Sequence, residues 1–217
     1  MSSYFNHARE PVNSFTHFIG AALSVFGTFL LVFGTLQDPA FSVRILAGGL
    51  VFGLSLVALY SASSLYHYVN CPAQILKRLR KLDHAMIYVL IAGTYTPIFL
   101  RFSQGQAGVR LCAAMWGIAL AGIILKVLWM EAPRWLSTLL YVAMGWAIVF
   151  DPSTLRSMPG GCIALIAAGG LAYTAGAVIY GVKKPNLLKR LGFHELFHLF
   201  VLLGSLLHFL AIYQYVI

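Results

Sequence analysis

Four ionisable residues lie at the ends of long apolar segments, where their side chains could meet in one layer. His67 closes one such segment, Asp83 opens the next, and His194 and His198 open the last. Because residues four apart share one face of a helix, the last two imidazoles can point toward one ion. A catalytic zinc typically takes three protein ligands and keeps a fourth position for water. The three histidines meet that requirement, and Asp83 would bind and orient the water.

Ser63 precedes His67 by four residues and therefore shares its helix face. Its hydroxyl could donate a hydrogen bond to Asp83 or to a substrate carbonyl. Each of these residues also has a simpler interpretation: a histidine at a helix end is often an interfacial polar group, and an aspartate at a helix start favours the positive end of the helix dipole. The convergence of three segments at one depth favours the metal site, because ionisable residues inside a membrane are costly and usually functional.

The composition is that of an integral membrane protein. The 217 residues are 60% hydrophobic and 10% charged, with a mean hydropathy of +0.83, whereas soluble proteins contain about 25% charged residues. A net charge of +9 would suggest nucleic-acid binding in a soluble protein, but here the basic residues gather between apolar segments, so we expect no nucleic-acid partner. The three cysteines, Cys71, Cys112 and Cys162, give no disulfide framework and no ligand spacing.

The charged residues divide the chain into segments of membrane-spanning length. A bilayer core about 30 Å thick requires roughly 20 helical residues, and the sequence predicts an all-α, seven-transmembrane helix bundle in one domain over residues 1–217. The predicted spans are residues 15–36, 43–66, 84–100, 111–130, 135–150, 159–182 and 194–215. The third and fifth are short, so their ends must enter the interface or the bilayer must thin. The first residues are polar and no cleavage site follows, so we expect no cleavable signal.

The basic residues are divided unequally between the two sides of this bundle. The amino terminus and alternate connections carry 11 of the 15, and the other side carries 4. The first set is Arg9, Lys77, Arg78, Arg80, Lys81, Lys126, Arg134, Lys183, Lys184, Lys189 and Arg190, and the second is Arg44, Arg101, Arg110 and Arg156. By the positive-inside rule, the amino terminus is cytoplasmic and, after seven spans, the carboxyl terminus lies outside. The same basic runs could contact anionic lipid head groups.

Several short motifs together resemble one known superfamily. They are Asn13-Ser-Phe-Thr-His17, Ser63-Ser-Leu-Tyr-His67, Leu82-Asp83-His84, Ile91-Ala-Gly-Thr-Tyr-Thr-Pro97, Phe193-His-Glu-Leu-Phe-His198 and Leu207-His208-Phe209. They resemble the progestin and adiponectin receptor superfamily, and most closely its bacterial hemolysin III branch, over essentially the whole chain. The resemblance implies a seven-helix, multi-pass protein of the bacterial plasma (inner) membrane with a cytoplasmic amino terminus.

The resemblance also implies a zinc ion (Zn²⁺) bound by His67, His194 and His198. An aspartate matching Asp83 would hold the water that the zinc binds, and a serine matching Ser63 would lie beside it, so both are candidate catalytic residues. The superfamily belongs to a wider group that includes alkaline ceramidases, which implies a membrane lipid partner and hydrolysis of a lipid amide. Zinc would lower the pKa of water and polarise the carbonyl, while Asp83 accepts the proton.

Two other functions remain open at this point. The hemolysin III branch is named for membrane lysis, so a non-enzymatic role in membrane sensing, homeostasis or lysis, with structural zinc, is the alternative to catalysis. The second is intramembrane proteolysis, because residues 194–198 also form an H-E-x-x-H pattern with Glu195 as the general base. No acidic ligand follows this pattern, and His67 and Asp83 fit the lipid hydrolase instead. Glu195 is then an interfacial residue or one that supports the ligands.

The remaining histidines of the apolar segments are weaker candidates. His17 would face the ligand layer and support it, or make a hydrogen bond in a helix contact. His208 lies ten residues beyond His198, about 15 Å deeper at 1.5 Å per residue. That distance is too great for one ion, so we expect His208 to be a polar group in helix packing.

Overall fold

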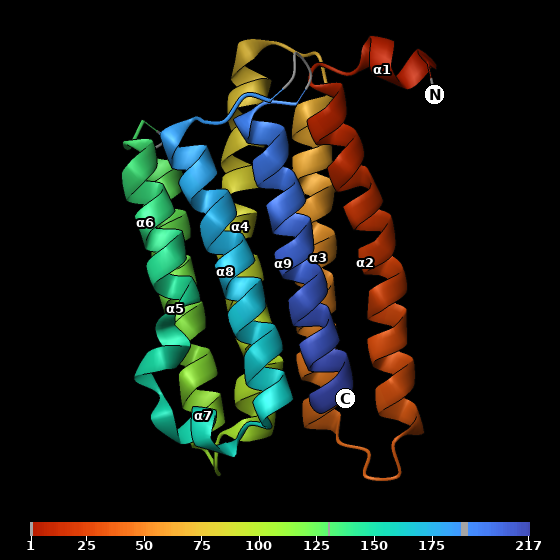
Figure 1. The fold of residues 1–217 in the computed structure, drawn as a ribbon, viewed down its shortest axis with the longest axis vertical. Coiled ribbons are helices and arrows are strands. Elements are labelled where there is room, and N and C mark those ends of the chain that lie inside the picture. Colours follow the sequence, from red (N-terminus) through yellow and green to blue (C-terminus); the bar gives the residue numbers. More distant parts are fainter. Residues whose placement is uncertain (1, 130, 188–190) are drawn as a thin grey trace.

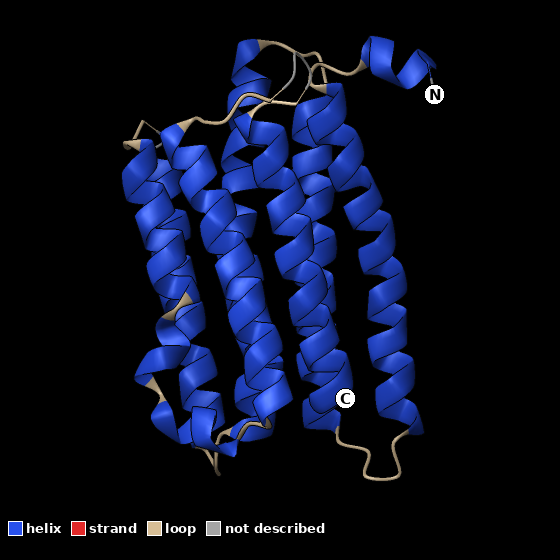
Figure 2. Ribbon diagram, in the orientation of Figure 1, coloured by secondary structure: helices blue, strands red, loops and turns tan. Residues whose placement is uncertain are grey.

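The computed structural model describes residues 2–129, 131–187 and 191–217, and over these ranges the chain is helical with no strand (Figure 2). The helices are α1 (Ser2–His7), α2 (Pro11–Gln37), α3 (Val43–Tyr68), α4 (Ala73–Phe102), α5 (Ala107–Leu128), α6 (Arg134–Gly145), the 3-10 turn η1 (Ala147–Phe150), α7 (Pro152–Ser157), α8 (Gly160–Val182) and α9 (Phe193–Tyr215). The all-α prediction is therefore confirmed for the described part of the chain.

Six of the described helices are long and apolar enough to cross a membrane: α2, α3, α4, α5, α8 and α9. The fifth predicted span is the exception, because α6 has only 12 residues. Figure 1 nevertheless shows α6 and η1 running beside α5, and the two chain ends at opposite ends of the bundle. The length criterion thus supports six spans, and the count of seven stays a prediction.

The helix that contains the third predicted span begins before that span. α4 starts at Ala73 rather than at His84, so the basic run Lys77 to Lys81 is part of the helix. Lysine, arginine and leucine are good helix formers, and a change in hydropathy marks the membrane boundary rather than the end of a helix. Two other predicted features, the Met130 end of the fourth span and the charges of Lys189 and Arg190, fall outside the described residues.

α6 ends at Gly145, where one tyrosine satisfies the freed backbone groups. The Tyr95 hydroxyl of α4 donates to the Gly145 carbonyl at 2.7 Å and accepts from the Ile148 N–H at 3.0 Å. A helix can break at membrane depth when neighbouring side chains replace its backbone bonds. The Trp146 indole also donates to Thr174 of α8 at 2.9 Å. The interrupted helix is thereby fixed against both α4 and α8.

Close helix packing places α3 and α4 side by side. A Cβ atom at Gly48 would lie 2.9 Å from the Pro97 Cα, and one at Gly93 would overlap the Ser55 hydroxyl. These glycines permit the close approach of the two backbones, as small residues do in membrane bundles. The outer surface is apolar: on α2, Phe26 is 60% exposed, as expected for a lipid-facing side chain.

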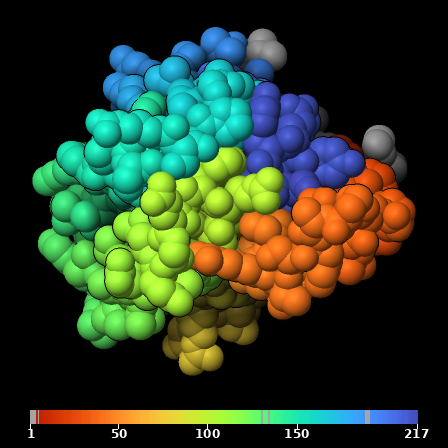
Figure 3. Space-filling model, turned by 90° about the horizontal axis from the view of Figure 1, so that it is seen from below, coloured from red at the N-terminus to blue at the C-terminus, as the bar shows by residue number. Residues whose placement is uncertain are grey.

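The helices pack in a closed order in which α2 contacts both α3 and α9, α4 contacts α3 and α5, and α8 contacts α6 and α9. Seen from below, the turn between α4 and α5 packs against the connection between α2 and α3 and the ends of α8 and α9 (Figure 3). The cavity described below begins at the opposite end of the bundle, where Glu10 and His194 line it. It continues into the interior of the bundle, where Ile148 and His208 line it.

Candidate metal centre

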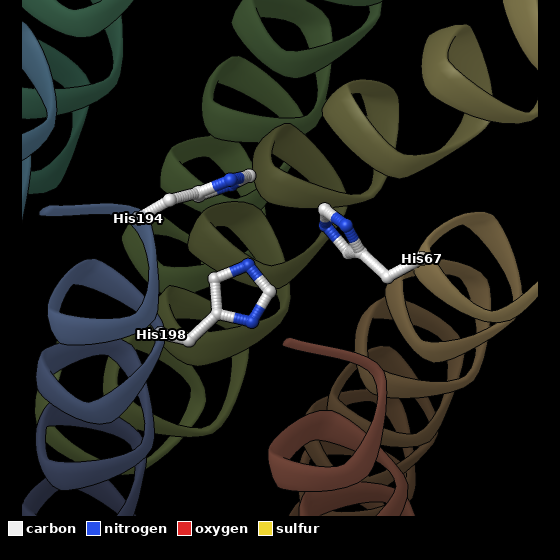
Figure 4. A group of neighbouring side chains, drawn as sticks. All are labelled: His67, His194 and His198. Carbon is white, nitrogen blue, oxygen red and sulfur yellow. The ribbon is translucent and has the colours of Figure 1, made fainter. Parts of the chain in front are cut away.

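Three histidines from two helices converge at one end of the bundle. His67 comes from the last turn of α3, and His194 and His198 come from the first turns of α9 (Figure 4). One possible ligand atom of each lies within 4.8 Å of the others. Their ring centroids are 4.9 to 5.0 Å apart with the rings edge to face. The sequence prediction that these three residues meet is confirmed.

The donor atoms of this cluster fit a metal ion. His67 Nε2 and His198 Nδ1 are buried and have no hydrogen-bond partner among the described residues. Buried polar atoms without a partner are rare in proteins, and an ion is one explanation for them. Nitrogens around a tetrahedral zinc lie about 3.4 Å apart at bond lengths of about 2.05 Å. A side-chain adjustment of about 1 Å would bring the three histidines to that spacing, so they could hold a metal ion.

Glu10 is a functional candidate that the sequence analysis did not identify. Its Oε2 lies 2.7 Å from His67 Nδ1 and 3.9 Å from His194 Nδ1, and it accepts a hydrogen bond from Asn13 Nδ2 at 3.2 Å. A carboxylate that accepts from one ring nitrogen fixes the tautomer and orients the other nitrogen for metal binding. Glu10 therefore holds His67 with Nε2 available to an ion.

The backbone before α2 places Glu10 beside His67. The N–H groups of Arg9 and Glu10 donate to the carbonyls of Tyr68 and His67 at 3.1 and 2.9 Å. The Arg9 guanidinium donates to the Tyr66 carbonyl at 2.8 Å and lies 4.7 Å from the centre of the Tyr66 ring. Pro11 then occupies the first turn of α2, where its missing N–H costs nothing. These contacts attach the start of α2 to the end of α3.

Glu10 is strongly acidic in this position. Burial alone would raise the pKa of its carboxyl, but the hydrogen bond from His67, the charges of His67 and Arg9, and the bond from Asn13 outweigh burial and lower the pKa to about 2. The carboxylate is thus ionised over the physiological pH range and can only accept hydrogen bonds. That state suits its contact with the Nδ1–H of His67.

One cavity of about 440 Å³ joins the other predicted site residues to this cluster. Ser63 and Asp83 line it together with Glu10, His194 and His198. Ser63 is 2% exposed and Asp83 is partly buried. Neither makes a side-chain hydrogen bond with another described residue, and Asp83 is not one of the clustered ligand atoms. A carboxylate and a hydroxyl are therefore available in the same cavity as the imidazoles of His194 and His198, and His67 completes the cluster beside it.

His17 and Glu195 occupy different environments. His17 is 3% exposed and stacks on His198, with ring centroids 3.7 Å apart. Glu195 accepts a hydrogen bond from the Gly192 N–H at 2.9 Å and caps the amino terminus of α9, as a glutamate at this position commonly does. Only His17 of the two lines the cavity. The structure thus brings His17, and not Glu195, into contact with the histidine cluster.

His208 bonds to a neighbouring helix, as expected for a packing residue. Its Nε2 lies 3.1 Å from the Ile166 carbonyl of α8. It also lines the deep part of the cavity, away from the clustered histidines.

Comparison with known proteins adds a family to this geometry. Residues 5–209 match the family described as Haemolysin-III related. The chain is 36% identical to "Hemolysin-3" of Bacillus cereus over 96% of its own length and 92% of that protein. It is 34% identical to "Hemolysin-3 homolog" of Bacillus subtilis (strain 168), covering 97% and 96% of the two chains. It is also 26% identical to the "Monocyte to macrophage differentiation factor" of Homo sapiens, covering 97% and 84%.

Proposed function

The chain belongs to the haemolysin-III-related family of multi-pass bacterial membrane proteins, and we propose that it is a zinc-dependent hydrolase of lipid amides. The human relative supports the relationship with the progestin and adiponectin receptor superfamily. The observation that carries the proposal is the shared cavity, in which Asp83 and Ser63 accompany His194 and His198 of the cluster that could hold a metal. A three-nitrogen site that leaves a position open is typical of catalytic rather than structural zinc.

Each residue of the cluster and the cavity has one role in this proposal. His67, His194 and His198 would hold the zinc, and Glu10 orients His67. Zinc at such a site lowers the pKa of water toward 7 and polarises a carbonyl. Asp83 accepts the proton of the attacking water and returns it to the amine that leaves. Ser63 donates a hydrogen bond to the amide carbonyl.

The lower cavity suits an acyl chain. Its walls between the metal-site end and His208 include Leu59, Ile87, Leu90 and Ile98. Burial of apolar surface contributes about 25 cal/mol per Å², so a long hydrocarbon chain would supply much of the binding energy. The amide would then lie at the end of the bundle that carries the histidines.

The metalloprotease alternative is less well supported. A general base must reach the water that it activates, whereas the Glu195 carboxylate accepts a bond from the α9 backbone and does not line the cavity. The non-enzymatic alternative makes no use of Asp83, and the next experiment separates it from hydrolysis.

Metal removal tests the proposed activity. The purified protein, in neutral detergent, should hydrolyse at least one member of a panel of long-chain amides that includes ceramides. A chelator should abolish this turnover, and added zinc should restore it, because the water is activated only when the ion is bound. Release of fatty acid is the measurement. If the folded, zinc-loaded protein cleaves no member of the panel, the non-enzymatic membrane role becomes the better account.

A second experiment tests the arrangement in the membrane. We place the single 217-residue domain in the plasma (inner) membrane with seven spans, in which α6 and η1 form the fifth, and with the amino terminus in the cytoplasm. The division of 11 basic residues against 4 supports this orientation. A reporter fused after Ile217 should be active only if it functions outside the cytoplasm, and one inserted at the exposed Lys184 only if it functions inside. A carboxyl terminus found in the cytoplasm would reduce the count to six.

A further inference from the structure

A buried lysine faces the cavity without a carboxylate partner. Lys126, in the last turn of α5, is 6% exposed, and its ammonium donates to the Ser137 hydroxyl at 3.1 Å. All six acidic residues of the sequence lie in the described ranges, and none of them forms an ion pair with Lys126. Burying an ammonium is costly unless it is paired, and this one has three donors, of which one is used.

One further cation, Arg80, and the imidazole of His84 line the cavity with Lys126. Both belong to α4, Ser137 also lines the cavity, and Arg80 is near enough for its charge to act on Lys126. This group, which we call the basic corner, is Arg80, His84, Lys126 and Ser137. Two positive charges at a wall shielded from water attract an anion. The acidic groups nearby are Asp83, which also lines the cavity, and Glu131, whose charge acts on Lys126 without forming an ion pair with it.

The basic corner lies across the cavity from the histidine cluster. α5 and α6 stand on one side of α4 and α8, whereas α3 and α9 stand on the other (Figure 1). α4, between the two sides, carries Asp83, which comes three residues after Arg80. A molecule whose amide lies at the histidines and Asp83 could therefore extend its head group toward Lys126.

From this arrangement we propose that the basic corner binds an anionic group of the head group, a carboxylate or a phosphate. This assignment rests on the proposed function, whose substrate class it narrows to lipid amides with an acidic head, such as N-acyl amino acids, in preference to neutral ceramides. In the reaction, the water oxygen bonds to the acyl carbon, the carbon–nitrogen bond breaks, and the amine takes the proton. The products are a fatty acid and an amino acid that keeps its own carboxylate at the basic corner.

The binding of two matched amphiphiles, each with an ether in place of the amide, tests the basic corner without any hydrolysis. Hexadecyloxyacetate is anionic, hexadecyloxyethanol is neutral, and neither contains a scissile amide. In neutral detergent, the zinc-loaded protein should bind the anion at least about tenfold more tightly, the usual effect of a hydrogen bond to a charged group. The fluorescence of Trp146, which lines the cavity, provides the binding signal.

Three variants locate the preference. Lys126→Met removes the charge but keeps an unbranched apolar side chain, and it should reduce the preference to about one, while Lys126→Arg should retain it. Lys77→Met, at a side chain 60% exposed and outside the cavity, makes the same change in net charge and should leave the preference unchanged. An anion preference that persists in Lys126→Met would assign the carboxylate to the zinc or to another site and would overturn the proposal.

Two further outcomes are separable. Inorganic phosphate and hexadecyl phosphate are each added as competitors of hexadecyloxyacetate at matched ionic strength. Inorganic phosphate should compete poorly. If it competes as well as hexadecyl phosphate does, the site binds free anions and the proposal is wrong. An anion preference that depends on Lys126, in a protein that cleaves no amide, would support the basic corner and overturn only the hydrolase.

Discussion

His67→Ala, His194→Ala and His198→Ala are each expected to reduce bound zinc from roughly one ion per chain to near zero after dialysis, because three protein ligands are the usual minimum for such a site. Zinc binding is linked to folding. At zinc concentrations near 1,000 times the Kd, loss of binding removes about 4 kcal/mol of stabilisation. Metal analysis of the dialysed proteins and thermal unfolding with and without chelator measure the two effects. The chelator should destabilise the wild type and leave the three variants unchanged.

His208→Ala is the matched control, since it also removes a buried, cavity-lining histidine of α9. It loses the bond to Ile166 and should still retain its zinc. The zinc affinity of Glu10→Gln should lie between these two cases. The glutamine amide oxygen can still accept a hydrogen bond from His67 but carries no charge, and such supporting contacts are worth about 10- to 100-fold in metal affinity. Full zinc occupancy in His198→Ala would show that the metal lies elsewhere.

The fold was predictable where hydropathy and helix length agree. α3 and α9 begin within one residue of the predicted spans, because each coincides with one apolar run. The basic turns of α4 were missed, since hydropathy reports the membrane boundary whereas propensity decides where a helix ends. The break after Gly145 depends on the Tyr95 hydroxyl of another helix. No local pattern encodes such a contact.

The candidate site was partly predictable for a similar reason. His194 and His198 share a helix face by spacing alone, and the alternation of helix direction brings His67 to the same end. Glu10 precedes α2 and reaches His67 only because the backbone of residues 9 and 10 bonds to the end of α3. Lys126 looked like one more charge marking topology, and its burial against α6 is a tertiary feature. Glu195, by contrast, had a local signal, its position in the first turn of α9, that predicted a cap as readily as a base.

Asp83→Asn is expected to retain zinc and to lose hydrolysis by about 10²- to 10⁴-fold, the usual contribution of a general acid or base. Asparagine has nearly the same shape, but it cannot accept the proton of the water. Asp83 is not among the clustered ligand atoms, so the metal content should not change. Glu195→Gln is the matched control, because its amide oxygen can still accept from the Gly192 N–H, and its turnover should stay near that of the wild type. In a metalloprotease, Glu195→Gln would lose more turnover than Asp83→Asn.

The zinc content of Asp83→Asn makes this result interpretable. A variant that loses turnover but keeps its metal and its unfolding temperature has lost a chemical step, since both the site and the fold are intact. If zinc falls as far as in His198→Ala, Asp83 is itself a ligand and its role as proton acceptor must be given up. If zinc and turnover both persist, the water is activated without Asp83. Ser63, whose hydroxyl shares the cavity, would then be the next side chain to test, because it could relay the proton to bulk water.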